Sequence, residues 1–203
     1  HYQPVVGVDG SILSAEAPIN SPVLTDGAAF YQLQEEIRGA FECTIVDLPR
    51  NMLVLHPHLI TDVQVAVLVT ELTLAAARDA IRILSWFKSN APHTQMIVVA
   101  NRVPAGGQLE ISRKDFEGSI ERKIDVLIPL EQKLAAQAAK FGKPLAEAGK
   151  AAKSLMPLQE LAVRITAITD TGERDDDVAV RGKGSSLLDK LKVKLPAKGK
   201  AKK

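Results

Sequence analysis

Four short apolar runs in the sequence are each followed directly by polar side chains. Asp47 follows the first run, and its carboxylate could hold Mg²⁺ through water, because it supplies a hard oxygen ligand. Asn101 and Arg102 follow the third run, where an amide and a guanidinium could hydrogen-bond to or stack on a purine. Thr70-Glu71 and Pro129-Leu130-Glu131 follow the other two runs. These residue types suit a nucleotide site assembled from several segments.

The runs themselves are rich in Val and Ile, and none alternates strictly between apolar and polar residues. This pattern is typical of strands buried on both faces, as in a parallel sheet covered by helices. Ligands of such sheets bind beyond the carboxyl ends of the strands, so the polar residues are expected along one edge. The four predicted strands are Cys43–Val46, Val63–Val69, Met96–Ala100 and Val126–Ile128.

Helical patterns precede and separate these runs. Asp26 is a candidate N-cap for the first helix, and Ser112 with Asp115 resembles a capping box for the third. Helices alternating with strands predict an α/β fold, with a doubly wound, mostly parallel sheet and flanking helices. The predicted helices span residues 26–40, 74–84, 112–120, 134–141 and 155–165, and only Ser11 to Ala15 is strand-like before them.

The loop that usually cradles phosphates is missing from this sequence. No G-x-x-x-x-G-K-[ST] motif occurs, and neither Gly149-Lys150 nor Gly182-Lys183 is followed by Ser or Thr. We therefore expect the chain alone to bind a nucleotide weakly. The chain begins with His1 rather than Met, so we expect it to be a piece of a longer protein.

Composition excludes several classes of protein. The 203 residues are 46% hydrophobic and 25% charged, which suffices for one substantial core. The single cysteine, Cys43, excludes a disulfide scaffold and a Cys-rich zinc module, and it fits a reducing, cytoplasmic setting. No apolar run reaches the roughly 18 residues that a membrane-spanning helix needs.

Charge is distributed unevenly, although the net charge is only +2. Residues 181–203 hold nine basic side chains and one acidic one, whereas residues 170–177 carry a net charge of −4. The remaining body is slightly acidic and is no obvious nucleic-acid binder. We predict a folded domain over residues 1–169, an acidic flexible linker over 170–184 and a basic amphipathic tail over 185–203.

The predicted tail would be amphipathic if it were helical. Two interpretations stay open: a solvated basic tail, since so short an isolated helix is marginal in water, or a helix that forms on an anionic bilayer. The absence of aromatic residues argues against a nucleic-acid partner. The membrane interpretation uses Leu187, Leu188, Leu191 and Leu195 on one face, with Lys190, Lys192 and Lys194 around them.

Simpler structural interpretations compete with each chemical one. Asp47 could cap a turn after its strand, and Asn101-Arg102 could be an ordinary loop. His56 and His58 flank a proline, and we favour a short helix cap over a metal site because no third ligand lies nearby in sequence. Cys43 is most simply a small core residue.

Several segments together resemble the later half of a MinD/ParA-type ATPase. The resemblance covers roughly residues 26–167 and depends on the order and spacing of moderate motifs. The DLPR motif and the segment SRKDFEGSIERKID are most similar to the CpaE/TadZ branch, which serves assembly of Flp/Tad pili. The matching segments are FECTIVDLPR (41–50), VAVLVTELTLAAARDAIRIL (65–84), MIVVANR (96–102) and IPLEQKLAAQAAKFGKPLAE (128–147).

The resemblance implies a P-loop NTPase-like domain that dimerises around ATP and Mg²⁺, with its N-terminal P-loop part absent from this chain. Asp47 would be the Walker B aspartate and metal ligand. Asn101 and Arg102 would approach the adenine, and the loop from Pro129 to Glu131 would lie beside the base. The DLPR sequence lacks the Gly that follows this aspartate in MinD-like members, so the full-length protein could be an ATPase or an ATPase-derived scaffold.

The same resemblance implies a function and a location. The protein would localise the pilus secretion machinery at the inner membrane or cell pole, as a cytoplasmic homodimer that contacts anionic lipid through its tail. The alternative is a ParA-like partitioning ATPase that binds DNA non-specifically through its basic end.

Overall fold

The structure, a computed structural model, describes residues 2–4, 11–14, 20, 26–106, 109–149 and 152–172. The chain divides into two compact units, His1–Thr61 and Asp62–Lys203.

A three-stranded parallel sheet forms the centre of the second unit. Its strands are β3 (Val65–Thr70), β4 (Gln95–Val103) and β5 (Val126–Pro129), in the order β3-β4-β5. Val98 and Val99 are neighbours on opposite faces of β4, and both are fully buried. Both faces of the sheet are therefore covered, as the continuous apolar runs predicted, and three of the four predicted strands are confirmed.

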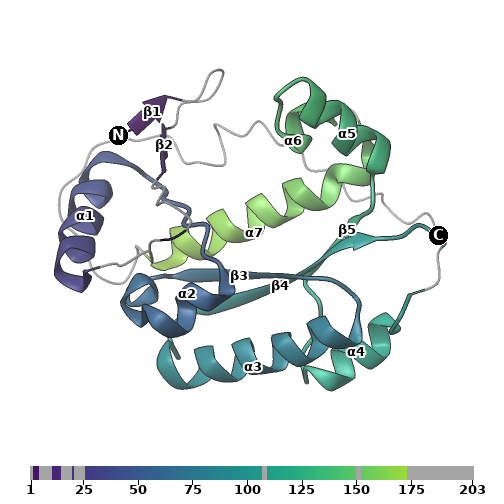
Figure 1. The fold of residues 1–203 in the computed structure, drawn as a ribbon, viewed down its shortest axis with the longest axis horizontal. Coiled ribbons are helices and arrows are strands. Elements are labelled where there is room, and N and C mark those ends of the chain that lie inside the picture. Colours follow the sequence, from purple (N-terminus) through teal and green to yellow (C-terminus); the bar gives the residue numbers. More distant parts are fainter. Residues whose placement is uncertain are drawn as a thin grey trace, which may run out of the picture. The chain divides into compact units, whose positions relative to one another are not determined.

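Helices cover the two faces of this sheet (Figure 1). One core cluster joins α3 (Leu74–Asn90) and α4 (Arg113–Ser119) to Val98 and Ala100 of β4. The other joins α7 (Met156–Gly172) to Ile97 and Val99 through Leu158, Leu161 and Ile165. The predicted caps are confirmed: the Ser112 hydroxyl accepts from the Asp115 N–H at the start of α4, at 3.1 Å.

Shorter helices follow β5. These are α5 (Gln132–Lys140), α6 (Leu145–Ala148) and the 3₁₀ turn η2 (Lys153–Leu155). Helix α7 extends to Gly172, three residues into the range predicted as a linker. The rest of that range and the predicted tail, with its leucines and lysines, lie outside the described residues.

The described residues of the first unit form a two-stranded antiparallel sheet and three helical segments. Strand β2 (Ser11–Leu13) lies where the sequence is strand-like, and it pairs antiparallel with β1 (Tyr2–Pro4), which was not predicted. The helical segments are α1 (Gly27–Ala40), α2 (Arg50–Leu55) and η1 (Pro57–Ile60). The Asp26 carboxylate accepts from the Ala29 N–H at 2.8 Å, which confirms the predicted N-cap of α1.

The prediction of a buried strand at Cys43–Val46 is wrong. These residues form no strand in the structure, Cys43 is exposed, and the side chain of Ile45 is 85% exposed. A strand needs a neighbour to take up its backbone hydrogen bonds, and the run has no paired neighbour among the described residues. The interpretation of Cys43 as a core residue is also wrong, because its side chain is exposed.

A buried carboxylate fixes the end of α4. Glu117 is only 7% exposed, and it accepts hydrogen bonds from Arg113 Nε at 2.8 Å, Lys123 Nζ at 2.9 Å and the Ile124 N–H at 3.0 Å. Lys123 makes the largest contribution, followed by Arg113 and the Ile124 amide, and together they lower the pKa of Glu117 from 4.5 to about 2.

Acid should therefore destabilise the fold in a defined range. The ionised Glu117 stabilises the folded state above its unfolded pKa of 4.5, and this contribution is lost as the pH falls to its folded pKa of about 2. Urea unfolding should show a falling free energy between these pH values. The Glu117→Gln variant should be less stable at neutral pH and lose part of that slope, whereas Glu121→Gln, an exposed neighbour, should retain it. Equal slopes in both variants would contradict this role.

Candidate functional site at the strand ends

The carboxyl ends of the three parallel strands lie along one edge of the sheet. Thr70 pairs with Ala100, and Val103 pairs with Pro129, so the last residues of the strands and those just after them are brought together. Strand β4 is longer than the apolar run predicted, and Asn101 and Arg102 lie within its carboxyl end rather than after it. We call these residues the strand-end rim: Glu71, Asn101, Arg102, Pro129 and Glu131. The rim unites the polar residues that the sequence predicted after the second, third and fourth apolar runs.

The backbone of Arg102 is the unusual feature of this rim. Its φ of 53° is in the left-handed region, which costs a non-glycine residue roughly 1–2 kcal/mol. The β4–β5 register is irregular between Ala100 and Val103, so the two intervening residues bulge from the ladder. Strained backbone of this kind concentrates at functional sites, where neighbouring contacts hold it in place.

Neighbouring contacts hold the bulge in place. The Arg102 N–H donates to Asn101 Oδ1 at 2.8 Å, and Arg102 Nη1 donates to Glu71 Oε1 at 3.2 Å. Beyond the bulge, the Leu130 N–H donates to the Val103 carbonyl at 2.8 Å, which ties the loop after β5 to the end of β4. The side chains of the rim are thus presented from a fixed backbone.

The chemistry of the rim suits a planar, nitrogen-rich ligand. With Oδ1 of Asn101 engaged by its own chain, the amide nitrogen is the group that can donate to a ring nitrogen or carbonyl of a base. The side chain of Arg102 is 69% exposed, and its guanidinium offers a flat cationic face for stacking. The half-buried carboxylate of Glu131 stands at the start of α5 without capping it, so it can accept from an exocyclic amine.

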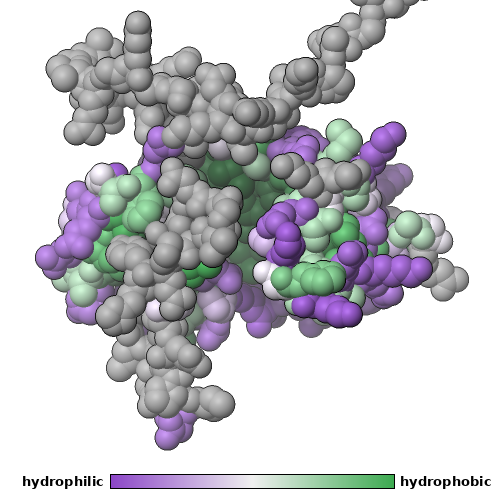
Figure 2. Space-filling model, turned by 90° about the horizontal axis from the view of Figure 1, so that it is seen from above, coloured by the Kyte–Doolittle hydropathy of each residue, from purple (hydrophilic) through white to green (hydrophobic). Residues whose placement is uncertain are grey.

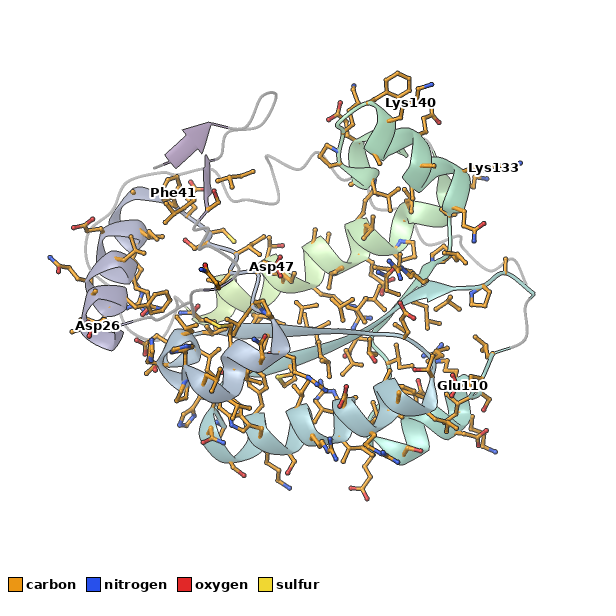
Figure 3. The ribbon with its side chains drawn as sticks, viewed as in Figure 1. Asp26, Phe41, Asp47, Glu110, Lys133 and Lys140 are labelled. Carbon is orange, nitrogen blue, oxygen red and sulfur yellow. The ribbon has the colours of Figure 1, made fainter. Side chains whose placement is uncertain are left out.

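Another acidic residue, Glu110, lies close to this edge, and the sequence motifs do not indicate a role for it. The Leu74 N–H at the start of α3 donates to Glu110 Oε1 at 3.2 Å, and the Thr73 hydroxyl accepts from the Ala76 N–H at 3.1 Å. Glu110 is labelled in Figure 3. The sequence indicates Glu71 only as a residue after a strand, whereas its ion pair with Arg102 joins residues 31 positions apart. No local sequence signal reports such a pair.

Asp47 belongs to the first unit, and its side chain is exposed. Its nearness to the rim and its role as a magnesium ligand stay predictions. In the described part of the chain, no three His, Cys, Asp or Glu side chains are grouped to hold a metal ion. His56 immediately precedes η1, and its ring lies 5.6 Å from that of His58, edge to face.

Glycine should relieve the strain at position 102. We expect Arg102→Gly to be about 1 kcal/mol more stable than Arg102→Ala, because both lose the ion pair with Glu71 but only glycine adopts a positive φ freely. Chemical denaturation of the two variants measures the difference. An alanine variant as stable as the glycine variant would show that the backbone at Arg102 is not strained.

Among the helices of the described residues, none combines the length and the apolar character that crossing a bilayer requires.

No family model matches this sequence, and no curated protein matches it. Solved structures do share its fold. The ParA family ATPase from Chlorobium tepidum TLS aligns with a TM-score of 0.62 at 16% identity, over 81% of this chain and 63% of that one. The MinD cell division protein of Aquifex aeolicus aligns with a TM-score of 0.54 at 21% identity, over 79% and 65%.

A third structure, the MinC:MinD cell division protein complex of Aquifex aeolicus, aligns with a TM-score of 0.50 at 19% identity, over 80% of this chain and 64% of that one. The chain thus spans slightly less than two thirds of the length of these proteins. The likeness shows the fold, which is the α/β fold of the ParA and MinD ATPases, as predicted.

Proposed function

We propose that this chain is the C-terminal part of a MinD/ParA-like nucleotide-binding domain, and that the strand-end rim receives the adenine of ATP. The observation that carries the proposal is the strained bulge at Asn101-Arg102. It presents amide donors and a guanidinium at the carboxyl edge of a parallel sheet, which is where ligands of this architecture bind.

The residues present fit the adenine base of ATP. Asn101, Arg102 and Glu131 supply the donors, the stacking surface and the acceptor that a purine needs. In this proposal Asp47 holds Mg²⁺, and a phosphate-binding loop outside this sequence completes the site. When bound, Mg²⁺ would neutralise charge on the phosphates. The chain's own contribution is to bind and orient the base.

We further propose that the full-length protein is a Flp/Tad pilus assembly protein of the CpaE/TadZ type. It would be an ATPase or an ATPase-derived scaffold that localises the secretion machinery at the inner membrane or cell pole. The DLPR run and the residues 112–125 support this branch. ATP would act as a switch if it bound the dimer better than the monomer, and two tails on one dimer would raise the avidity for lipid.

A ParA-like partitioning ATPase is the second candidate. The net charge of +8 on residues 181–203 favours it, because such a segment can bind duplex DNA through phosphates alone. Both candidates share the nucleotide site and differ in what the tail contacts.

The nucleotide part is tested in the full-length protein by ATP-dependent self-association, measured by light scattering. We expect Asp47→Ala and Asn101→Ala each to weaken the ATP dependence. Lys88→Ala, an exposed residue near the end of α3, serves as the control and should not. If Asn101→Ala associates like the wild type, the rim does not contact the base.

The tail is tested by comparing the chain with a version that ends at residue 184. Loss of binding to anionic vesicles on truncation supports the pilus-type scaffold. Loss of duplex-DNA retention without any vesicle effect supports the partitioning ATPase instead. If truncation changes neither, the tail has no part in localisation.

A further inference from the structure

Helix α5 presents an unpaired basic stripe to solvent. Lys133 and Lys140 are seven residues apart, which places them on one side of the helix about 10 Å apart along its axis. Ala136 and Gln137 lie between them on the same side, and all four side chains are exposed. Both lysines project outward from the helix, away from the sheet (Figure 3).

Neither lysine is neutralised by the fold. Helix α5 contains no acidic residue, and Lys133 and Lys140 have no ion-pair partner among the described residues. Lys143 differs in this respect, because its ammonium group lies 2.7 Å from Glu147. The opposite side of α5 is anchored through Leu134 and the buried Ala138, so the basic stripe has a fixed orientation.

An exposed aromatic ring lies at the end of the same helix. Phe141 is the C-cap residue of α5, and 63% of its surface is exposed, although it is one of only five phenylalanines in the chain. Leu134 lies seven residues earlier on the same side of the helix and is half-buried. The ring of Phe141, where the helix ends, is instead exposed to solvent. Over α5 and α6, hydrophobic and hydrophilic residues lie side by side on the surface (Figure 2).

Two unpaired lysines beside an exposed aromatic ring fit one kind of partner best. The phosphates of duplex DNA would engage the lysines but leave Phe141 in water, since a paired duplex offers no stacking face at its backbone. An anionic bilayer uses both groups, because phosphates lie directly above an apolar layer that an aromatic ring can enter. The basic residues of 181–203 have the same charge complementarity to such a surface.

We propose that the stripe Lys133–Lys140 together with Phe141 is a second contact with an anionic phospholipid surface, separate from the tail. The lysines bind lipid phosphates, and the ring of Phe141 inserts at the boundary between headgroups and acyl chains. This contact does not depend on nucleotide binding. It would fix the orientation of the folded domain on the bilayer, which a tethered tail alone cannot do.

The test measures partition of the 203-residue chain onto vesicles of phosphatidylcholine with phosphatidylglycerol, at low ionic strength. Each lysine near an anionic surface contributes to the free energy of binding. The double variant Lys133→Gln/Lys140→Gln should therefore have a partition coefficient about thirtyfold lower than that of the wild type. Phe141→Ser should lose about tenfold. The matched control is Lys88→Gln/Lys114→Gln, which removes the same charge from exposed positions on α3 and α4, across the sheet from α7.

The outcomes separate cleanly. The proposal stands if the α5 variants lose binding, the control double variant does not, and thermal unfolding shows all of them folded. It is overturned if both double variants lose binding equally, because net charge alone then explains the effect. It is also overturned if no variant loses binding, if the wild type does not bind, or if the α5 variants lose retention of duplex DNA instead.

Discussion

Replacing Phe116 with Ala is expected to lower the free energy of unfolding by about 3–5 kcal/mol, a loss large enough to threaten the fold. Phe116 is fully buried on α4, within the cluster that joins α3 and α4 to the sheet. Its removal would leave a cavity in this cluster, because the surrounding backbone is held by the helices and the sheet and can close the space only in part. Urea denaturation of the purified variant measures the loss.

Phe141→Ala is the matched control for this prediction. It removes the same atoms from a side chain that is 63% exposed, so its effect should stay within about 0.5 kcal/mol. If the two variants lost similar stability, the core would not lie between α4 and the sheet.

Gly149→Ala should cost about 1–3 kcal/mol through steric overlap alone. A Cβ at this position would overlap Leu155 Cδ1, and it would lie 2.7 Å from Leu134 Cδ2 and 3.2 Å from the Leu145 carbonyl. The φ of Gly149 is −102°, so the backbone itself would tolerate alanine. The side chains of Leu134 and Leu155 would have to shift to admit the new methyl group, and Leu155 is buried, so differential scanning calorimetry should show a lower melting temperature.

Gly118→Ala is the corresponding control within α4. A Cβ there meets nothing within 4 Å, so alanine should raise the stability by roughly 0.5–1 kcal/mol through its helix propensity. A Gly149→Ala variant as stable as the wild type would mean that Leu134 and Leu155 do not close over this glycine.

Local signals allowed most of the second unit to be predicted. Continuous Val and Ile runs identified β3, β4 and β5, because a strand buried on both faces has no need of polar positions. Capping residues identified the starts of α1 and α4, since an N-cap acts within three residues of its own position.

The rest depends on partners that are distant in sequence. The run Cys43–Val46 has the composition of a strand, but composition does not supply the neighbour that a strand needs, and Ile45 is exposed. The left-handed backbone of Arg102 follows from the bulge between β4 and β5, and its ion pair with Glu71 depends on the parallel register. The candidate rim could therefore be located from the sequence, while its geometry could not.

The central claim is that the strand-end rim binds the base of a nucleotide, and it is tested most directly by titrating the ¹⁵N-labelled chain with ADP at millimolar concentrations. We predict that the backbone amides of Asn101, Arg102 and Leu130 shift together with a single affinity. The chemical shifts of the amides of Asp125 and Val126, at the amino end of β5, should not change. Shifts confined to the amino ends of the strands, or no shift at the rim, would contradict the claim.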